Sequence, residues 1–241
     1  MADRKINAAD IIKQAVCYLC GLILIAIGIS FTKLSRLGIS PVSSIPRALE
    51  VIWGFTLGTT TFIVYCVLIL AQLAVLRKKF TWRNLLGLPL TFVFSWLVDV
   101  FGTNPDAFGH LLAGIPNPEN YFLRLLFTIT GIIIIGIGVF LYLRPKWVPM
   151  PAEGLAGAIS SVTKLSFGDC KTIVDTSMIT IALILQLIFL GGFSSFTSEN
   201  VVEREGTILA AICVGQVVKL LTKLLGSRVD ALIGKKPKTT D

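Results

Sequence analysis

The stretch Gly21-Leu-Ile-Leu-Ile-Ala-Ile-Gly28 recurs 110 residues later as Gly131-Ile-Ile-Ile-Ile-Gly-Ile-Gly138. The same offset joins Gly58 to Gly168, with no gap between the first match and the last. Isoleucine matches are common in apolar sequence, but glycine constrains where a backbone can bend or approach another, so its shared spacing is informative. The chain therefore contains an internal repeat, and the repeated halves of a membrane protein usually surround a central binding site.

Both copies lie in strongly apolar sequence. Of the 241 residues, 54% are hydrophobic and 15% are charged, and the mean hydropathy is +0.80. Roughly 20 apolar residues cross the hydrocarbon core of a bilayer as a helix. Four windows without charge meet this length: Gln14–Thr32, Val51–Leu76, Leu125–Leu143 and Thr176–Ser198.

Two further windows, Asn84–Gly102 and Gly206–Leu225, hold isolated charges and are also predicted to span, which makes six membrane helices in an all-α polytopic protein. The N-terminal apolar run is long and lacks a small-residue cleavage site, so it is expected to be a retained helix and not a signal peptide. The predicted organisation is a cytoplasmic N-terminus (1–13), a first three-helix repeat (14–103), an external loop (104–121), a second three-helix repeat (122–226) and a basic cytoplasmic tail (227–241).

Positive charge alternates from one side of the predicted bundle to the other. Seventeen Lys and Arg residues fall on the side of the two termini, and five fall on the opposite side. The positive-inside rule therefore predicts that both termini are cytoplasmic. The basic residues cluster at helix ends and form no face interleaved with aromatic residues, which argues against a nucleic-acid partner.

Three spanning helices are an odd number, so the second half is expected to enter the membrane from the opposite side. The repeat is therefore predicted to be an inverted 3+3 arrangement. The third helices align only at an offset of 120, which sets Asp99 opposite Lys219.

A short apolar segment follows the first helix of each half, beginning at Pro41 in one and at Pro151 in the other. Each predicts a helix of about ten residues, which is too short to cross a bilayer. Two alternatives remain open: the short helices lie flat at the interface, or they are re-entrant and dip in from opposite faces. In the second case, their N-termini would favour an anionic or polar ligand.

Charged and small polar residues gather in and after these two segments. Lys171 and Asp175 have the spacing of an intrahelical ion pair, so a purely structural pairing is one interpretation. The other is that they line a substrate path, since intramembrane charge is costly without a partner. The candidate substrate-binding residues are Ser43, Ser44, Arg47, Glu153, Gly154, Lys171 and Asp175.

The sequence offers little for catalysis or cofactor binding. It has one histidine, His110, in the predicted external loop, and its Cys17-x-x-Cys20 pair lies inside an apolar helix, where packing is the expected role. We therefore expect no enzyme activity, no catalytic residues, no cofactor and no metal site.

Gly38-Ile-Ser-Pro-Val42, Trp53-Gly-Phe-Thr-Leu-Gly58 and Glu205-Gly-Thr-Ile-Leu-Ala-Ala-Ile-Cys-Val-Gly215 carry a family likeness. With these motifs the chain resembles the YczE/YyaS/YitT-like bacterial integral membrane proteins. The resemblance implies a multi-helix fold in a bacterial inner membrane, and it supplies no substrate.

The expected function is transport of a small anionic or zwitterionic solute, with the site between the two halves. The alternatives are a substrate-binding membrane subunit of a multi-component transporter, or a membrane sensor or accessory protein without transport activity. The expected partners are the lipid bilayer and a small-molecule substrate, with a homo-oligomer or a separate energising subunit left open.

Overall fold

The computed structural model describes residues 8–103, 111–112, 114–190 and 202–234, and every regular element in these ranges is helical. The elements are α1 (Ala8–Ser35), η1 (Pro41–Ser43), α2 (Ser44–Trp53), α3 (Leu57–Leu76), η2 (Arg77–Lys79), α4 (Trp82–Leu85), α5 (Gly87–Val100), α6 (Tyr121–Leu143), α7 (Pro151–Val162), α8 (Phe167–Phe189) and α9 (Glu205–Leu232). Residues 104–110 and 113 of the predicted external loop lie outside the described residues.

Five helices are long and apolar enough to cross a membrane: α1, α3 with η2, α6, α8 and α9. The chain is therefore an all-α, multi-pass membrane protein. The predicted third span is shorter than expected, because α5 has 14 residues. That is about 21 Å of helix, against the roughly 30 Å of a hydrocarbon core. α9 continues to Leu232, past the boundary expected at residue 226.

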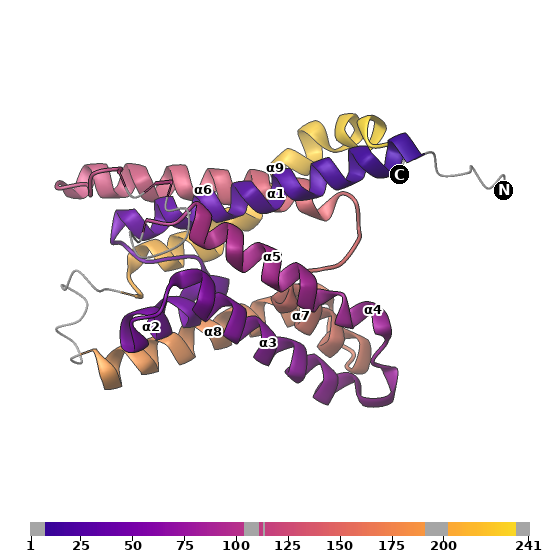
Figure 1. The fold of residues 1–241 in the computed structure, drawn as a ribbon, viewed down its shortest axis with the longest axis horizontal. Helices are drawn as coiled ribbons and strands as arrows, with labels where there is room; N and C mark the ends of the chain where they lie inside the picture. The colour runs from indigo at the N-terminus through magenta and orange to yellow at the C-terminus, as the bar shows by residue number, and fades with distance from the viewer. Residues whose placement is uncertain (1–7, 104–110, 113, 191–201, 235–241) are drawn as a thin grey trace.

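Helices α1 and α6 form an antiparallel pair along one side of the molecule (Figure 1). A Cβ atom added to Gly21 would lie 2.7 Å from the carbonyl oxygen of Gly138, and one added to Gly138 would lie 2.7 Å from that of Gly21. The corresponding distance between Gly28 and Gly131 is 2.9 Å in both directions. The repeated glycines are therefore needed at this interface, because any side chain would force the two backbones apart.

The link from each of these helices to its short helix follows the same path. Arg36 and Lys146, which are 110 residues apart, both have φ of 55°, a left-handed conformation that is uncommon for residues other than glycine. The backbone N–H of each donates to a carbonyl three residues earlier, at 3.2 Å and 3.3 Å. Helices α2 and α7 then each pack against both α3 and α8.

The long helices after the short ones also begin alike. Thr56 caps α3 and Ser166 caps α8, each accepting a hydrogen bond from the backbone N–H three residues later, at 3.1 Å and 3.2 Å. α2 ends at Gly54, which is left-handed with φ of 72°. Ser43 precedes α2 without a side-chain capping bond, because it is bonded instead to Ser40 through the two hydroxyls, at 3.1 Å.

The halves differ in their last helices. α5 packs against α1 and α3, whereas α9 packs against α6 (Figure 1). Asp99 of α5 accepts hydrogen bonds from the backbone N–H of Gly58 and from the Thr56 hydroxyl, both at 2.8 Å. Gly168, the counterpart of Gly58, has only the Ser166 hydroxyl near its open side. The N-terminus of α3 is therefore covered by α5, while no described helix covers that of α8 in the same way.

Candidate functional site

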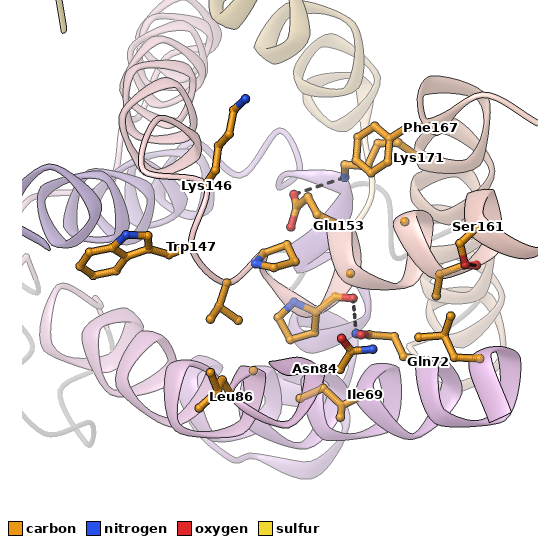
Figure 2. A pocket seen from close by; sticks show the side chains of 18 of the residues that line it. Ile69, Gln72, Asn84, Leu86, Lys146, Trp147, Glu153, Ser161, Phe167 and Lys171 are labelled. Carbon is orange, nitrogen blue, oxygen red and sulfur yellow. Dashed lines mark hydrogen bonds and ion pairs between the residues drawn. The ribbon is translucent and has the colours of Figure 1, made fainter. Parts of the chain in front are cut away.

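A cavity of about 1020 Å³ opens between α3, the start of α5, the end of α6, α7 and the start of α8 (Figure 2). Both halves of the repeat contribute to its walls. The first half supplies Ile69, Gln72 and Lys79, and the second supplies Trp147 and Glu153, among other residues. Because α1 and α6 are antiparallel, they finish at opposite ends of the molecule. The cavity lies at the end where α3 and α6 finish.

Glu153 and Lys171 lie across from one another in the cavity wall, on α7 and α8 (Figure 2). The Lys171 ammonium is 3.8 Å from Glu153 Oε1 and 2.5 Å from Asp175 Oδ1. We call Glu153, Lys171 and Asp175 the second-half triad. Lys171 thus makes the intrahelical pair expected from its spacing and also contacts the cavity acid, so two carboxylates share one cation.

Part of the Glu153 carboxylate is left without a partner. Its Oε2 is buried and meets no donor at hydrogen-bond geometry within the described residues, and the hydroxyl of the buried Tyr142, which is also unpaired there, lies close to the Glu153 side chain. A buried carboxylate oxygen without a donor is costly, so this position favours a ligand group that can donate a hydrogen bond. Its place in the first turn of α7 stabilises the negative charge.

Gly154 is held close to α3 by a polar contact that the sequence did not indicate. The Gln72 amide donates to the Pro151 carbonyl at 3.0 Å, and a Cβ on Gly154 would lie 2.8 Å from that amide nitrogen (Figure 2). A side chain at this position would displace the Gln72 amide from the Pro151 carbonyl, so glycine preserves this contact between α3 and α7. In the sequence, a glutamine in the apolar second half of α3 was the feature that could have indicated a polar contact for Gln72.

The structure places Arg47, Ser43 and Ser44 elsewhere. Arg47 pairs with Glu50 at 2.6 Å, and Glu50 also pairs with Lys33 at 2.6 Å. We call Lys33, Arg47 and Glu50 the first-half triad. Ser43 and Ser44 are buried at the start of α2 and do not line the cavity. The seven predicted residues are thus divided between two regions, and only Glu153, Gly154, Lys171 and Asp175 lie at the cavity or directly behind it.

Lysines surround the open end of the cavity. Lys79 follows α3 and Lys146 follows α6, and both are exposed. With Lys171 deeper inside, the wall carries three cations and the single carboxylate of Glu153. An anionic group would therefore be attracted to the opening, and a donor group to the inner end. In the described ranges, no three His, Cys, Asp or Glu side chains converge as a metal site.

A family of unknown function, DUF6198, matches residues 12–223. The chain is 25% identical over 196 residues to the uncharacterized protein YyaS of Bacillus subtilis, covering 78% of this chain and 92% of that protein. It is 24% identical over 207 residues to an uncharacterized protein of Haemophilus influenzae, covering 86% and 82%. No solved structure matches significantly. The likeness to YyaS confirms the family resemblance seen in the sequence.

Proposed function

Because the chain belongs to DUF6198, a family without an assigned activity, we propose its function from geometry: it is a small-molecule transporter of the bacterial inner membrane. The observation that carries the proposal is the cavity of about 1020 Å³ with walls from both halves of the repeat and with Glu153 and Lys171 in its wall. Secondary transporters built from inverted repeats bind their substrates at such a junction.

The contacts between α1 and α6 support an inverted repeat. Gly21 corresponds to Gly131 and Gly28 to Gly138, and the observed contacts are Gly21 with Gly138 and Gly28 with Gly131. A two-fold axis exchanges these two contacts, which is the signature of a symmetric interface. The helices are antiparallel, so the axis that relates the halves lies across the bundle and in the plane of a membrane.

This arrangement requires the chain to return between α3 and α6. The hydroxyl of Ser30, near the end of α1, donates to the carbonyl of Phe101, just after α5, at 2.6 Å. α5 therefore leads from the end where α3 finishes to the end where α1 finishes (Figure 1). We infer that α4 and α5 together carry the chain across the membrane, with α5 tucked between α1 and α3.

Charge supports an orientation for the cavity. It opens beside Lys79 and Lys146, at the end where the basic segments after α3 and α6 lie. The described chain ends meet at one place, since the Gln14 amide donates to the Ile233 carbonyl at 3.2 Å. We infer from the positive-inside rule that this end is cytoplasmic and that the cavity opens to the cytoplasm.

The short helices α2 and α7 are best explained as re-entrant. Their buried faces include Ala48 on α2 and Ala152 and Ala156 on α7, and both helices pack against the long helices α3 and α8. A helix lying on a membrane surface would have fewer protein neighbours. Non-spanning backbone at membrane depth is tolerated where it is buried in protein or lines a cavity, as the start of α7 does.

The distribution of charge favours a zwitterionic substrate. An ammonium group would supply the donor that Glu153 Oε2 lacks, and an acidic group would be attracted by Lys79 and Lys146. Rocking of the halves about the α1–α6 pair would then expose the same site to the other side.

The test is counterflow in liposomes containing the purified protein, using a panel of radiolabelled amino acids and small organic acids. We expect uptake of at least one zwitterion by the wild type and a loss of at least tenfold in the Glu153→Gln variant. The matched control is Glu205→Gln, since Glu205 is exposed and pairs with the adjacent Arg204. Undiminished counterflow in Glu153→Gln would reject this site. Binding without counterflow, together with a co-purifying ATPase, would favour a subunit of a multi-component transporter.

A further inference from the structure

A second buried acid lies away from the cavity, in the segment that joins α8 to α9. Glu203 is 4% exposed, and neither of its carboxyl oxygens has a hydrogen-bond partner within the described residues. Its backbone is held firmly, since the N–H groups of Val202 and Glu203 both donate to the Gln186 side-chain oxygen, at 3.1 Å and 2.7 Å. The side chain is therefore held in the interior by α8.

Two hydroxyls from different elements, Ser44 of α2 and Thr207 of α9, lie close to the carboxyl group and partly offset the effect of burial on its pKa. The Ser44 hydroxyl donates to the Ser40 carbonyl at 3.3 Å, and the Thr207 hydroxyl accepts from the Ile39 backbone at 3.2 Å. Both are thus partly occupied by other bonds. Neither brings a positive charge to the carboxyl group.

The charged groups on the neighbouring elements have partners of their own. Arg204 pairs with Glu205, at the start of α9. On α1 and α2, Lys33 and Arg47 pair with Glu50. Arg36, at the end of α1, also has interactions of its own.

An ionised carboxylate in such surroundings is strongly disfavoured, whereas a protonated carboxyl is neutral and can donate one hydrogen bond. Burial raises the pKa of Glu203 to about 7. The surroundings of Glu203 and its raised pKa thus both favour the protonated carboxyl.

Glu203 lies at the end of the molecule opposite to the cavity opening. Hydrogen bonds connect the two halves of the repeat at this end. The backbone N–H of Gly206 donates to the Leu37 carbonyl at 2.7 Å, and Ile39 is bonded to Thr207. These bonds connect the α1–η1 link to the start of α9. They must loosen if the molecule is to open on this side.

We infer that Glu203 is a proton-binding site coupled to the conformational change. The carboxylate takes up one proton from the aqueous phase when this end is open, and the resulting carboxylic acid is enclosed when it closes. The proton returns to solvent when the end opens again. This inference rests on the proposed transport function for its role, while the protonation itself is independent of any substrate.

The first experiment measures the thermal unfolding of the full chain in detergent between pH 5 and pH 8, for the wild type, Glu203→Gln and Glu205→Gln. We expect the Tm of the wild type and of the Glu205→Gln control to fall as pH rises, and the Tm of Glu203→Gln to be much less dependent on pH. A wild-type slope retained in Glu203→Gln would overturn the inference.

A second measurement covers the case in which Glu203→Gln does not fold. Infrared titration of the wild type should show a buried protonated carboxyl that is lost near pH 7, and Glu203→Asp should keep this signal at a shifted midpoint. No such signal in the wild type, or one unchanged in Glu203→Asp, would overturn the inference.

Transport separates this inference from the proposed function. In liposomes with an imposed pH gradient, the wild type should accumulate a transported zwitterion, while Glu203→Gln should lose accumulation and retain counterflow. Accumulation equal to that of the wild type would reject coupling through Glu203. If no counterflow occurs with either protein, the transport proposal fails, and the pH titrations still decide whether Glu203 binds a proton.

Discussion

Gly21 and Gly138 face each other across the α1–α6 interface so closely that a Cβ on either would lie 2.7 Å from the carbonyl oxygen of the other. Their repeat counterparts, Gly131 and Gly28, are as close, since a Cβ on either would lie 2.9 Å from the carbonyl oxygen of the other. Two contacts related by exchange of the halves therefore hold the long helices together.

The first prediction concerns this interface. Gly21→Ala and Gly138→Ala should each lower the free energy of unfolding by about 1–3 kcal/mol, because the added methyl group overlaps a backbone that cannot move without separating the helices. Gly215→Ala on α9 is the control, since a Cβ there has no neighbour within 4 Å. Thermal unfolding in detergent measures all three, and equal stability of Gly21→Ala and Gly215→Ala would contradict the close packing.

The second prediction concerns the second-half triad. Lys171→Met removes the cation that contacts both Glu153 and Asp175, leaving two carboxylates close together in a largely buried place. The loss of stability should be on the order of 3 kcal/mol. The double variant Lys171→Met/Asp175→Asn should recover part of it, because one of the two negative charges is gone.

Lys164→Met serves as the control for this series, since Lys164 is exposed in the link between α7 and α8. Thermal unfolding is again the measurement. A double variant no more stable than Lys171→Met would mean that repulsion between the carboxylates is not the cause.

The third prediction concerns the first-half triad. Glu50→Gln leaves Lys33 and Arg47 as neighbouring cations in a site where Glu50 is 6% exposed. We expect a loss on the order of 3 kcal/mol, against little change for Glu205→Gln, which breaks an exposed pair. Chemical denaturation in detergent would test this, and a cost as small as that of the control would show that the buried pairs contribute little.

The fourth prediction is the size and sign of the pH dependence from Glu203. The pKa of this carboxyl is about 7 in the folded protein, against the usual 4.5. The folded state therefore binds the proton more tightly than the unfolded chain, so this stabilisation is complete below about pH 4.5 and is lost as pH rises through 7. The change should be about 3 kcal/mol, measured as the difference in pH dependence between the wild type and Glu203→Gln.

Much of the fold was predictable because it depends on patterns among residues that are neighbours in the sequence. The windows around α1, α3, α6, α8 and α9 are apolar over enough residues to span a membrane, and all five were predicted from this property. The short apolar segments that begin at Pro41 and Pro151 indicated the two short helices, α2 and α7. The length of α5 was not predicted, since apolar residues continue before Gly87 into a segment that turns at α4.

The candidate site was only partly predictable. Lys171 and Asp175 pair as their spacing in the sequence indicated, and Glu153 joins them through Lys171, but Arg47 does not. Its partner Glu50 lies three residues away, a spacing that could have been recognised. Lys33 and Gln72 gave weaker signals, because the residues they contact, Glu50 and Pro151, belong to other helices.

By itself, the sequence determined the membrane class, five of the six predicted membrane helices at spanning length, and a repeat whose glycines keep a constant spacing, since hydrophobic runs and backbone constraints act over neighbouring residues. Only the tertiary structure decided which charges meet, that one cavity is lined by both halves, and that the Glu203 carboxyl is buried with no hydrogen-bond partner among the described residues. These features depend on contacts between segments far apart in the chain. Burial then sets the cost of each charge, and that cost is defined only after the helices have packed.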